Sequence, residues 1–479
     1  MTGKGETADN VDLTFKGGLV VTPTGVIRGG VAVAGDVITH VGPDSTLPRA
    51  ARELDVAGKV IFPGIIDPHV HIGVGDGWGP AKMRADFETE SRDAAVGGIT
   101  TMVTTTLFGR EPRVEVLSDG IGWGNDHSLV DFRFTVVMVT RDHLVELPAL
   151  VEIGARSFKF FLGYKGPQGE SFGMDPDGVP WDFFYAGCEA IRDAIPAAFP
   201  MIHAEDPEVR DLLIERMRSS ARTDYLQAWH EACPNITEPM QLYSAALIAN
   251  EVGTPVYAVH VSAAESVDLI RDLRARGFQT QGETLTAFLY YTAAEADERG
   301  IGAYAKVQPP IRADRDRAAL WHGVRDGTIQ YVGSDTQMYT VASQGGDFWD
   351  ARVGLGPGLA TMFPATYTAG VLGGECTLED LARVCAENSA RRFDLYPQKG
   401  VLQSGSDADL IVFDPTARRE TRAADLPSES AYTIYEGESL GGWPELVMLR
   451  GNVIVEDGAV VENRHIGRHV PATVAQASG

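Results

Sequence analysis

The feature that most constrains the fold is a regular alternation of short apolar runs with longer amphipathic segments between residues 61 and 335. Runs of this length are typical of buried parallel strands, and the segments between them, such as 239–252 and 264–276, predict helices that cover the strands. Eight such runs are present, at 61–66, 100–106, 132–139, 157–163, 199–204, 256–261, 278–283 and 329–335.

Eight parallel strands with intervening helices predict an α/β fold, a closed (β/α)8 barrel of the triosephosphate isomerase (TIM) type. A doubly wound open sheet is the alternative, but no GxGxxG motif opens a helix after the first run. The barrel is therefore the favoured architecture.

The two ends of the chain have a different texture. Short valine- and isoleucine-rich strands separated by glycine turns fill the first sixty residues, and the same pattern returns at 408–414 and 445–461. These segments predict one small β-sandwich built from both ends of the chain. The predicted domains are 1–63 (N-terminal segment of the β-sandwich), 64–394 (barrel), 395–463 (C-terminal segment of the β-sandwich) and 464–479 (C-terminal tail).

Charge and cysteine content narrow the partners and the compartment. Acidic residues outnumber basic ones by 66 to 41, and a net charge of −25 disfavours both nucleic acid and anionic membrane surfaces as partners. The four cysteines form no CxxC pair, and no run of 18 apolar residues and no basic, apolar leader is present. We therefore expect a cytoplasmic protein without structural disulfides.

Residues that ligate metals stand at the ends of the predicted strands, where this barrel builds its active sites. In the HxH of the first strand both side chains point to the same side, so both imidazoles can reach one ion. Each residue alone has an ordinary structural explanation, such as a hydrogen-bonded histidine or a helix cap. Together they predict a site of six residues: His69, His71, Lys159, His203, His260 and Asp335.

Lys159 is the least ordinary of the six because it lies in the apolar run SFKFF. A buried ammonium is costly unless it is paired with a carboxylate or chemically altered. A buried ion pair is one interpretation. The other is that burial lowers the pKa of the amine, which then takes up carbon dioxide to form a carbamate that bridges two metal ions.

Several motifs resemble those of the hydantoinase and dihydropyrimidinase group of cyclic amidohydrolases, in the amidohydrolase superfamily. The resemblance spans nearly the whole chain. Its motifs are FPGIIDPHVH (62–71), AAVGGITTM (94–102), FKFFLGYK (158–165), IHAED (202–206), VYAVHVSAAES (256–266), YAKVQPPIR (304–312), YVGSDT (331–336) and YPQKGVLQSGSDADLIVFDP (396–415).

This resemblance implies a binuclear site, most often of zinc, with a carbamate on Lys159 between the ions. His69, His71 and Asp335 would hold the more buried ion, and His203 and His260 the more exposed one. Zn²⁺ suits these ligands, although Mn²⁺, Fe²⁺, Co²⁺ and Ni²⁺ would tolerate them.

A pair of ions lowers the pKa of a bridging water to about 7, so hydroxide is available to attack the amide carbon of a cyclic substrate. Asp335 would move the proton to the leaving nitrogen. Tyr164 would bind the oxyanion, as its position after Lys159 implies. Asp67 is expected to orient a ligating histidine. The resemblance also implies a homotetramer or a homodimer.

The substrate is less well defined than the metal chemistry. Gln308 replaces a serine whose backbone binds the ring in many relatives. Gly354 falls near the expected substrate-binding asparagine. Thr336 replaces the histidine that follows GSD in the family's motif. These changes leave hydantoin, dihydropyrimidine or a related ring as the main expectation. Allantoin, dihydroorotate and a succinimide-like imide are the alternatives.

Two other classes of protein fit some of the pattern. A noncatalytic interaction protein on a dihydropyrimidinase-like scaffold is disfavoured because such relatives have lost metal ligands, whereas all six are present here. A mononuclear deaminase would fit HxH with a distant histidine and aspartate, but Lys159 argues against it.

Overall fold

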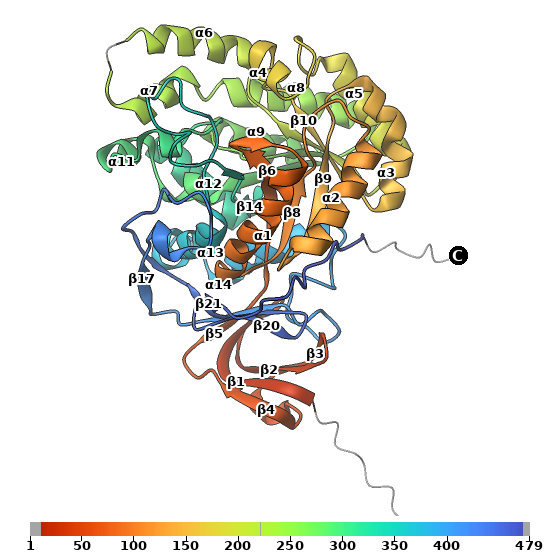
Figure 1. Cartoon of the computed structure of the whole chain (residues 1–479), viewed down its shortest axis with the longest axis vertical. Helices are drawn as coiled ribbons and strands as arrows, with labels where there is room; N and C mark the ends of the chain where they lie inside the picture. Colours follow the sequence, from red (N-terminus) through yellow and green to blue (C-terminus); the bar gives the residue numbers. More distant parts are fainter. Residues whose placement is uncertain (1–10, 221, 473–479) are drawn as a thin grey trace, which may run out of the picture.

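The computed structural model describes residues 11–220 and 222–472, and it places a barrel above a second sheet (Figure 1). Eight parallel strands form the barrel in chain order, which confirms the predicted (β/α)8 fold. They are β6 (Ile65–Gly75), β8 (Ile99–Thr105), β9 (Asp131–Val137), β10 (Ser157–Phe161), β11 (Phe199–His203), β12 (Val256–Ala258), β13 (Thr280–Leu285) and β14 (Ile329–Gly333).

The barrel closes through the segment that follows β14. The backbone N–H of Asp335 donates to the carbonyl oxygen of His69 at 2.9 Å, and β15 (Thr336–Met338) then pairs in parallel with β6. The last predicted site residue therefore lies directly beside the first, although 266 positions separate them in the sequence (335 − 69).

Two predicted strands depart most from the structure, and the bounds of the other six differ by at most two residues at either end. The run 61–66 divides between β5 (Val60–Pro63), which belongs to the second sheet, and β6, which belongs to the barrel. The run 256–261 forms a strand only as far as Ala258, because His260 adopts a positive φ of 41° that strand geometry does not allow. Apolar sequence alone marks neither change.

The second sheet joins the two ends of the chain, as the sequence predicts. Its strands run β21-β20-β19-β16-β5-β1-β2-β3, with β4 beside β1, and the antiparallel pairing of β5 with β16 links the N-terminal half to the C-terminal half. Besides β5, the strands are β1 (Val11–Thr22), β2 (Gly25–Ala34), β3 (Val37–Gly42), β4 (Ala50–Asp55), β16 (Leu410–Phe413), β19 (Pro444–Leu449), β20 (Asn452–Glu456) and β21 (Ala459–Val460).

Phe15, Ile38, Leu410 and Met448 belong to one buried cluster in this sheet, so residues from both ends of the chain share a core. The predicted domain boundaries stay a prediction. The first ten residues of the N-terminal segment (1–10) and the last seven of the tail (473–479) lie outside the described residues.

Helices separate the barrel strands. The helices predicted at 239–252 and 264–276 correspond to α8 and α9. None of the described helices has the length and apolar character needed to cross a membrane. The helices are α1 (Pro80–Val96), α2 (Arg113–His127), α3 (Leu147–Ile153), α4 (Gly166–Ser171), α5 (Trp181–Ala194), α6 (Pro207–Arg218), α7 (Tyr225–Ala232), α8 (Thr237–Val252), α9 (Ala264–Ala275), α10 (Thr286–Tyr290), α11 (Ala293–Glu298), α12 (Asp314–Asp326), α13 (Leu359–Tyr367), α14 (Leu378–Ala382) and α15 (Asn388–Arg392).

Candidate metal centre

One pocket opens at the carboxyl ends of the barrel strands, and it brings together nearly all the predicted site residues. Among the residues that line it are His71, Lys159, Tyr164, His203, His260, Gln308, Asp335 and Gly354. The remaining predicted ligand, His69, lies directly behind them, with its ring 5.0 Å from that of His71 and 5.7 Å from that of His260. The residues chosen from strand ends therefore share one site.

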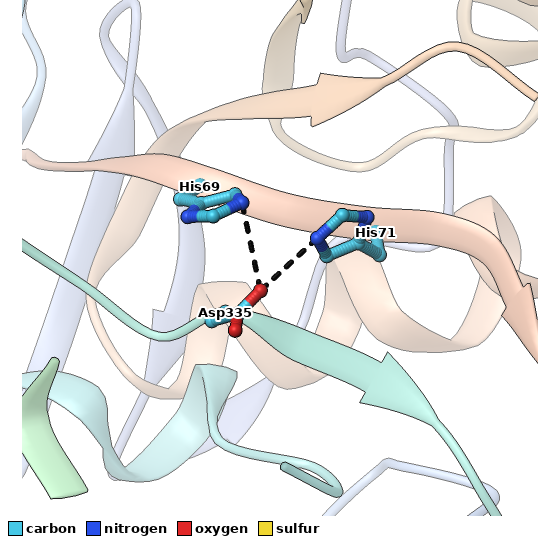
Figure 2. Close-up of side chains that lie close together, drawn as sticks. All are labelled: His69, His71 and Asp335. Atoms are coloured by element: carbon cyan, nitrogen blue, oxygen red, sulfur yellow. Dashed lines mark ion pairs between the residues drawn. The ribbon is translucent and has the colours of Figure 1, made fainter. Parts of the chain in front are cut away.

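His69, His71 and Asp335 form the most compact group in this pocket (Figure 2). The Oδ1 atom of Asp335 lies 3.0 Å from Nε2 of His71 and 3.5 Å from Nε2 of His69. Strand alternation on β6 points both imidazoles to the same side, as the HxH spacing predicts. Burial alone would raise the pKa of Asp335, but the two nearby histidines and Lys159 hold it below its usual value.

His203 and His260 form a second pair, with ring centroids 4.5 Å apart. Nε2 of His203 and Nδ1 of His260 are both buried and have no hydrogen-bond partner among the described residues. Burial and the nearby Lys159 lower the pKa of His69, His203 and His260 well below the usual histidine value. These imidazoles are therefore neutral near pH 7, which is the form that binds metals.

Strand alternation also explains why Lys159 points into the barrel. Phe160, its neighbour on β10, packs outward against Phe183 and Phe184 of α5, with ring centroids 5.7 and 5.4 Å away. Lys159 consequently faces the interior, where it is fully buried and its Nζ lies 3.3 Å from Nε2 of His69.

No carboxylate of the described residues lies within ion-pairing distance of this amine, so the structure lacks the buried ion pair that would explain Lys159 as a structural residue. Burial lowers the pKa of Lys159 to about 8, although Asp335 and Glu283 partly oppose that effect. Roughly a tenth of the amine is therefore neutral and nucleophilic at pH 7, far more than for an ordinary lysine.

Two site residues adopt left-handed backbone conformations that side chains with a Cβ rarely occupy. His260 has a φ of 41° and Asp335 a φ of 50°. Such conformations cost on the order of 1–3 kcal/mol each and cluster at functional sites. Both residues follow the end of a barrel strand, where the turn aims their side chains back over the barrel.

Glu283, two residues before the end of β13, is a site residue that the sequence argument missed. Its Oε1 lies 2.9 Å from Nδ1 of His69 and accepts the backbone N–H of His260 at 3.2 Å, while its Oε2 accepts the hydroxyl of Tyr257 at 2.7 Å. Burial raises the pKa of this carboxyl to about 7. The predicted run FQTQGE ends in this residue, so its position near the carboxyl end of a strand was a usable indication.

Asp67 was expected to orient a ligating histidine, but its side chain contacts the backbone instead. Its Oδ1 accepts the backbone N–H groups of His69 and Ser334, at 3.1 and 3.2 Å, so it fixes the closure of the barrel and contacts no imidazole. The contact that orients the ring of His69 comes from Glu283, and that of His71 from the hydroxyl of Thr105 at 3.0 Å.

Tyr164 lines the same pocket, with its ring 4.6 Å from that of His203. Burial raises the pKa of its phenol, so the hydroxyl keeps its proton and can donate a hydrogen bond. The preceding Gly163 is needed here, because a Cβ at that position would lie 2.6 Å from Cδ2 of His203.

Comparison with known proteins agrees with this architecture. Residues 228–454 match the model of the amidohydrolase family. The L-hydantoinase of Paenarthrobacter aurescens is 30% identical over 98% of this chain and 99% of its own, and the allantoinase of Rubrobacter xylanophilus is 32% identical over 94% and 95%. The solved L-hydantoinase (dihydropyrimidinase) from Arthrobacter aurescens superposes with a TM-score of 0.86 at 29% identity, covering 96% of this chain and 100% of that one.

A metal-binding hydrolase is the class that this barrel and this site define. The chain belongs to the amidohydrolase family, within its hydantoinase and dihydropyrimidinase group of cyclic amidohydrolases. It is accordingly a hydrolase of carbon–nitrogen bonds in cyclic amides.

The family binds divalent metal ions, and the donors found here fit such ions. Neutral imidazoles and an ionised carboxylate are the ligands that zinc and its neighbours in the first transition series prefer. The unpartnered ring nitrogens of His203 and His260 are otherwise unexplained in a buried site.

Proposed function

We propose that this protein opens a cyclic amide of the hydantoin or dihydropyrimidine type with two divalent ions, which we assign as zinc. His69, His71 and Asp335 would hold one ion, His203 and His260 the other, and a carbamate on Lys159 would serve both. The observation that carries the proposal is the placement of Lys159, a fully buried lysine without a carboxylate partner in the described region of the chain, among four histidines.

The carbamate follows from ordinary amine chemistry. The neutral Nζ of Lys159 attacks carbon dioxide, a nitrogen–carbon bond forms, and one proton is lost to solvent. The product carries one negative charge and two oxygen donors in place of an ammonium. A pKa of about 8 makes the neutral amine accessible for this step, and ions bound to the new oxygens would hold it in the carbamate form.

When bound, the two ions supply a water of lowered pKa and a Lewis acid for the amide oxygen. Asp335 accepts a proton from the attacking water and delivers it to the ring nitrogen as the carbon–nitrogen bond breaks. Its lowered pKa keeps it ionised and ready for that role. Tyr164 donates a hydrogen bond to the oxygen on which negative charge develops, an interaction worth on the order of 3 kcal/mol in comparable sites.

Ring opening produces a carboxylate and a ureido or amide group. Allantoin is the second candidate substrate, because allantoinases are among the similar relatives. Allantoin and hydantoin share the ring that would be opened, so the same residues would serve both reactions.

The proposal is tested with purified, metal-loaded enzyme against hydantoin, dihydrouracil, allantoin, dihydroorotate and succinimide. We expect turnover of at least one ring, two bound ions per chain by elemental analysis, and a carbamate ¹³C NMR resonance after exchange with labelled bicarbonate. That resonance should vanish in Lys159→Met and persist in Lys165→Met, whose lysine lies at the surface. Fully metal-loaded enzyme that opens none of the rings would refute the proposed activity.

A further inference from the structure

A chain of polar side chains runs from the protein interior to the pocket wall. Nη1 of Arg210 donates to Oε2 of Glu205 at 3.0 Å, and Nη2 of Arg210 donates to Oε1 of Gln168 at 3.2 Å. Nε2 of Gln168 then donates to Oε1 of Gln308 at 3.1 Å. Gln168 and Gln308 both line the pocket that holds the candidate metal ligands.

Arg210 fixes the direction of every hydrogen bond in this chain, because a guanidinium has five donors and no acceptor. Gln168 must therefore turn its oxygen toward Arg210 and its NH₂ group toward Gln308. Gln308 must in turn offer its oxygen to Gln168. The order is dictated by chemistry, so it does not depend on how either amide group is assigned.

The consequence is that the NH₂ group of Gln308 is left over at the pocket wall. It makes no hydrogen bond with the described residues, although only 5% of Gln308 is exposed. Gln308 lines the pocket, so this donor is open to whatever occupies it, and a ligand that offers an oxygen at this wall gains a hydrogen bond there.

We propose that Gln308 is a specificity-determining residue whose side-chain NH₂ group donates to an oxygen of the substrate other than the one at the reacting carbon. The pocket thereby selects cyclic amides that carry a second carbonyl or an equivalent acceptor over rings that lack one. This inference rests on the proposed function for its substrate class. It adds the polarity of one wall and the Glu205–Arg210–Gln168 chain that sets that polarity.

The chain offers a variant that inverts the wall without touching Gln308. In Gln168→Glu the new carboxylate still accepts from Arg210, but it can only accept from Gln308. The amide of Gln308 must then rotate, so that its oxygen faces the pocket. Gln308→Glu produces an acceptor at the same place directly, and Gln308→Met removes the donor while keeping the length of the side chain.

The probes are hydantoin and 2-thiohydantoin, which differ only in the atom on the carbonyl between the two ring nitrogens. Sulfur accepts hydrogen bonds weakly. Affinity by calorimetry and kcat/KM are both expressed as the ratio of the oxygen compound to the sulfur compound, so the intrinsic difference between the rings cancels when variants are compared with wild type.

We expect this ratio to fall about tenfold in Gln308→Met, the usual size of a lost hydrogen bond that leaves a buried acceptor unpaired. It should fall on the order of 30-fold or more in Gln308→Glu and Gln168→Glu, where two acceptors face each other. Gln337→Glu is the matched control, because it adds the same charge to the pocket lining and leaves the chain of hydrogen bonds intact.

The outcomes separate the two proposals. Wild type that binds and opens hydantoin, with a ratio that none of the three folded variants changes, overturns the role of Gln308 and leaves the proposed function in place. The same fall in Gln337→Glu assigns the effect to charge alone and also overturns the role of Gln308. Metal-loaded wild type that opens neither hydantoin nor any other ring of the substrate panel overturns both proposals.

Discussion

Lys159 and Lys399 are two fully buried lysines at opposite ends of the same barrel, and their surroundings differ in one respect. Lys159 on β10 pairs with the last residue of β9, Val137, whereas Lys399 contacts the first residue of β9, Asp131. Nζ of Lys399 lies 2.6 to 3.0 Å from the carboxylates of Asp131, Asp407 and Asp409. Lys159 has no carboxylate of the described residues at such a distance.

The pKa values of the two amines shift in opposite directions for this reason. Burial lowers both pKa values, but the three carboxylates around Lys399 outweigh that effect and raise the pKa of Lys399. The pKa of Lys159 is lowered to about 8. Arg450 adds a second cation on Asp131. The cluster therefore sets two cations against three carboxylates and keeps the ammonium of Lys399 charged, which suits a clamp between the barrel and the second sheet.

Proximity of ligand atoms alone does not separate the two sites. The oxygens of Asp131, Asp407 and Asp409 lie within 4.8 Å of one another, as do the donors of His69, His71 and Asp335. The ammonium of Lys399 already occupies the position that a cation would take among those oxygens. The site around Lys159 differs from the cluster around Lys399 in two ways: it has unpaired ligand atoms, and the pKa of its lysine is lowered. These two features, and not the clustering of ligands, mark the Lys159 site as the chemical one.

Replacing Lys159 gives the largest expected effect. Lys159→Met should lower kcat/KM on the order of 10³-fold or more, because the carbamate that would bring two ions together is lost. When both proteins are compared without metal, the free energy of unfolding should stay the same or rise, since an apolar side chain replaces a desolvated amine. Steady-state kinetics, elemental analysis and urea unfolding measure the three quantities. Full activity with two bound ions in this variant would contradict the role of Lys159.

Replacing Lys399 should do the reverse. Lys399→Met leaves three buried carboxylates without their central cation, and the free energy of unfolding should fall by about 3–5 kcal/mol. The kcat of the folded enzyme should not change, because the cluster lies at the far end of the barrel.

Urea unfolding tests this prediction, with Lys16→Met as the matched control. Lys16 forms a partly exposed ion pair with Glu53 at 2.6 Å, and its loss should cost less than about 1 kcal/mol. Equal stability changes in the two variants would show that the Lys399 cluster is not a clamp.

Glu283 tests whether the metal site depends on the contacts behind its ligands. Glu283→Gln should weaken metal affinity or activity about 10- to 100-fold, because the ring of His69 loses the carboxylate that orients it. Asp67→Asn is the companion variant, since Asp67 accepts the backbone N–H groups of His69 and Ser334 and not an imidazole. A larger loss of metal affinity in Asp67→Asn than in Glu283→Gln would reverse the roles assigned to these two carboxylates.

The sequence predicted the barrel and the gathering of the candidate ligands because both depend on local features. Each apolar run marks a strand, and a parallel strand has only one end at which this fold builds a site. Lys159 stood out for the same local reason, as a charge inside an apolar run. Whether the ligands bind metal stays a prediction.

Partners that meet only through tertiary closure were not predictable in this way. Glu283 lies 214 positions from His69, and Arg450 lies 319 positions from Asp131. Nothing local to Lys399 distinguishes it from an exposed lysine in a loop. The left-handed conformations of His260 and Asp335 could not be predicted either, because glycine is the residue that indicates such a conformation and neither residue is a glycine.

The smallest expected effect is a difference in pH dependence between the two sites in the metal-free protein. The buried histidines have folded-state pKa values well below the usual value of about 6.5. As the pH falls below about 6.5 the unfolded chain binds protons first, so each histidine reduces stability by at most about 1.4 kcal/mol per pH unit. The pKa of Asp131 is also lowered, so its contribution is lost only below about pH 4.

Buried carboxyls with raised pKa values, such as Glu90 at about 8, act in the opposite direction, because the folded state binds their protons first and loses stability as the pH rises. The change in the free energy of unfolding with pH therefore contains contributions of both signs. The informative quantity is the difference in this change between wild type and His203→Asn. Urea unfolding at about pH 7, 6 and 5 should give a shallower loss of stability in the variant, whereas Lys16→Met, which changes only a partly exposed ion pair, should leave that slope as it is in wild type. If the free energy of unfolding falls equally with pH in wild type and in His203→Asn, His203 is not held neutral by burial. The contrast between neutral histidines at the metal site and an ionised Lys399 cluster would then be wrong.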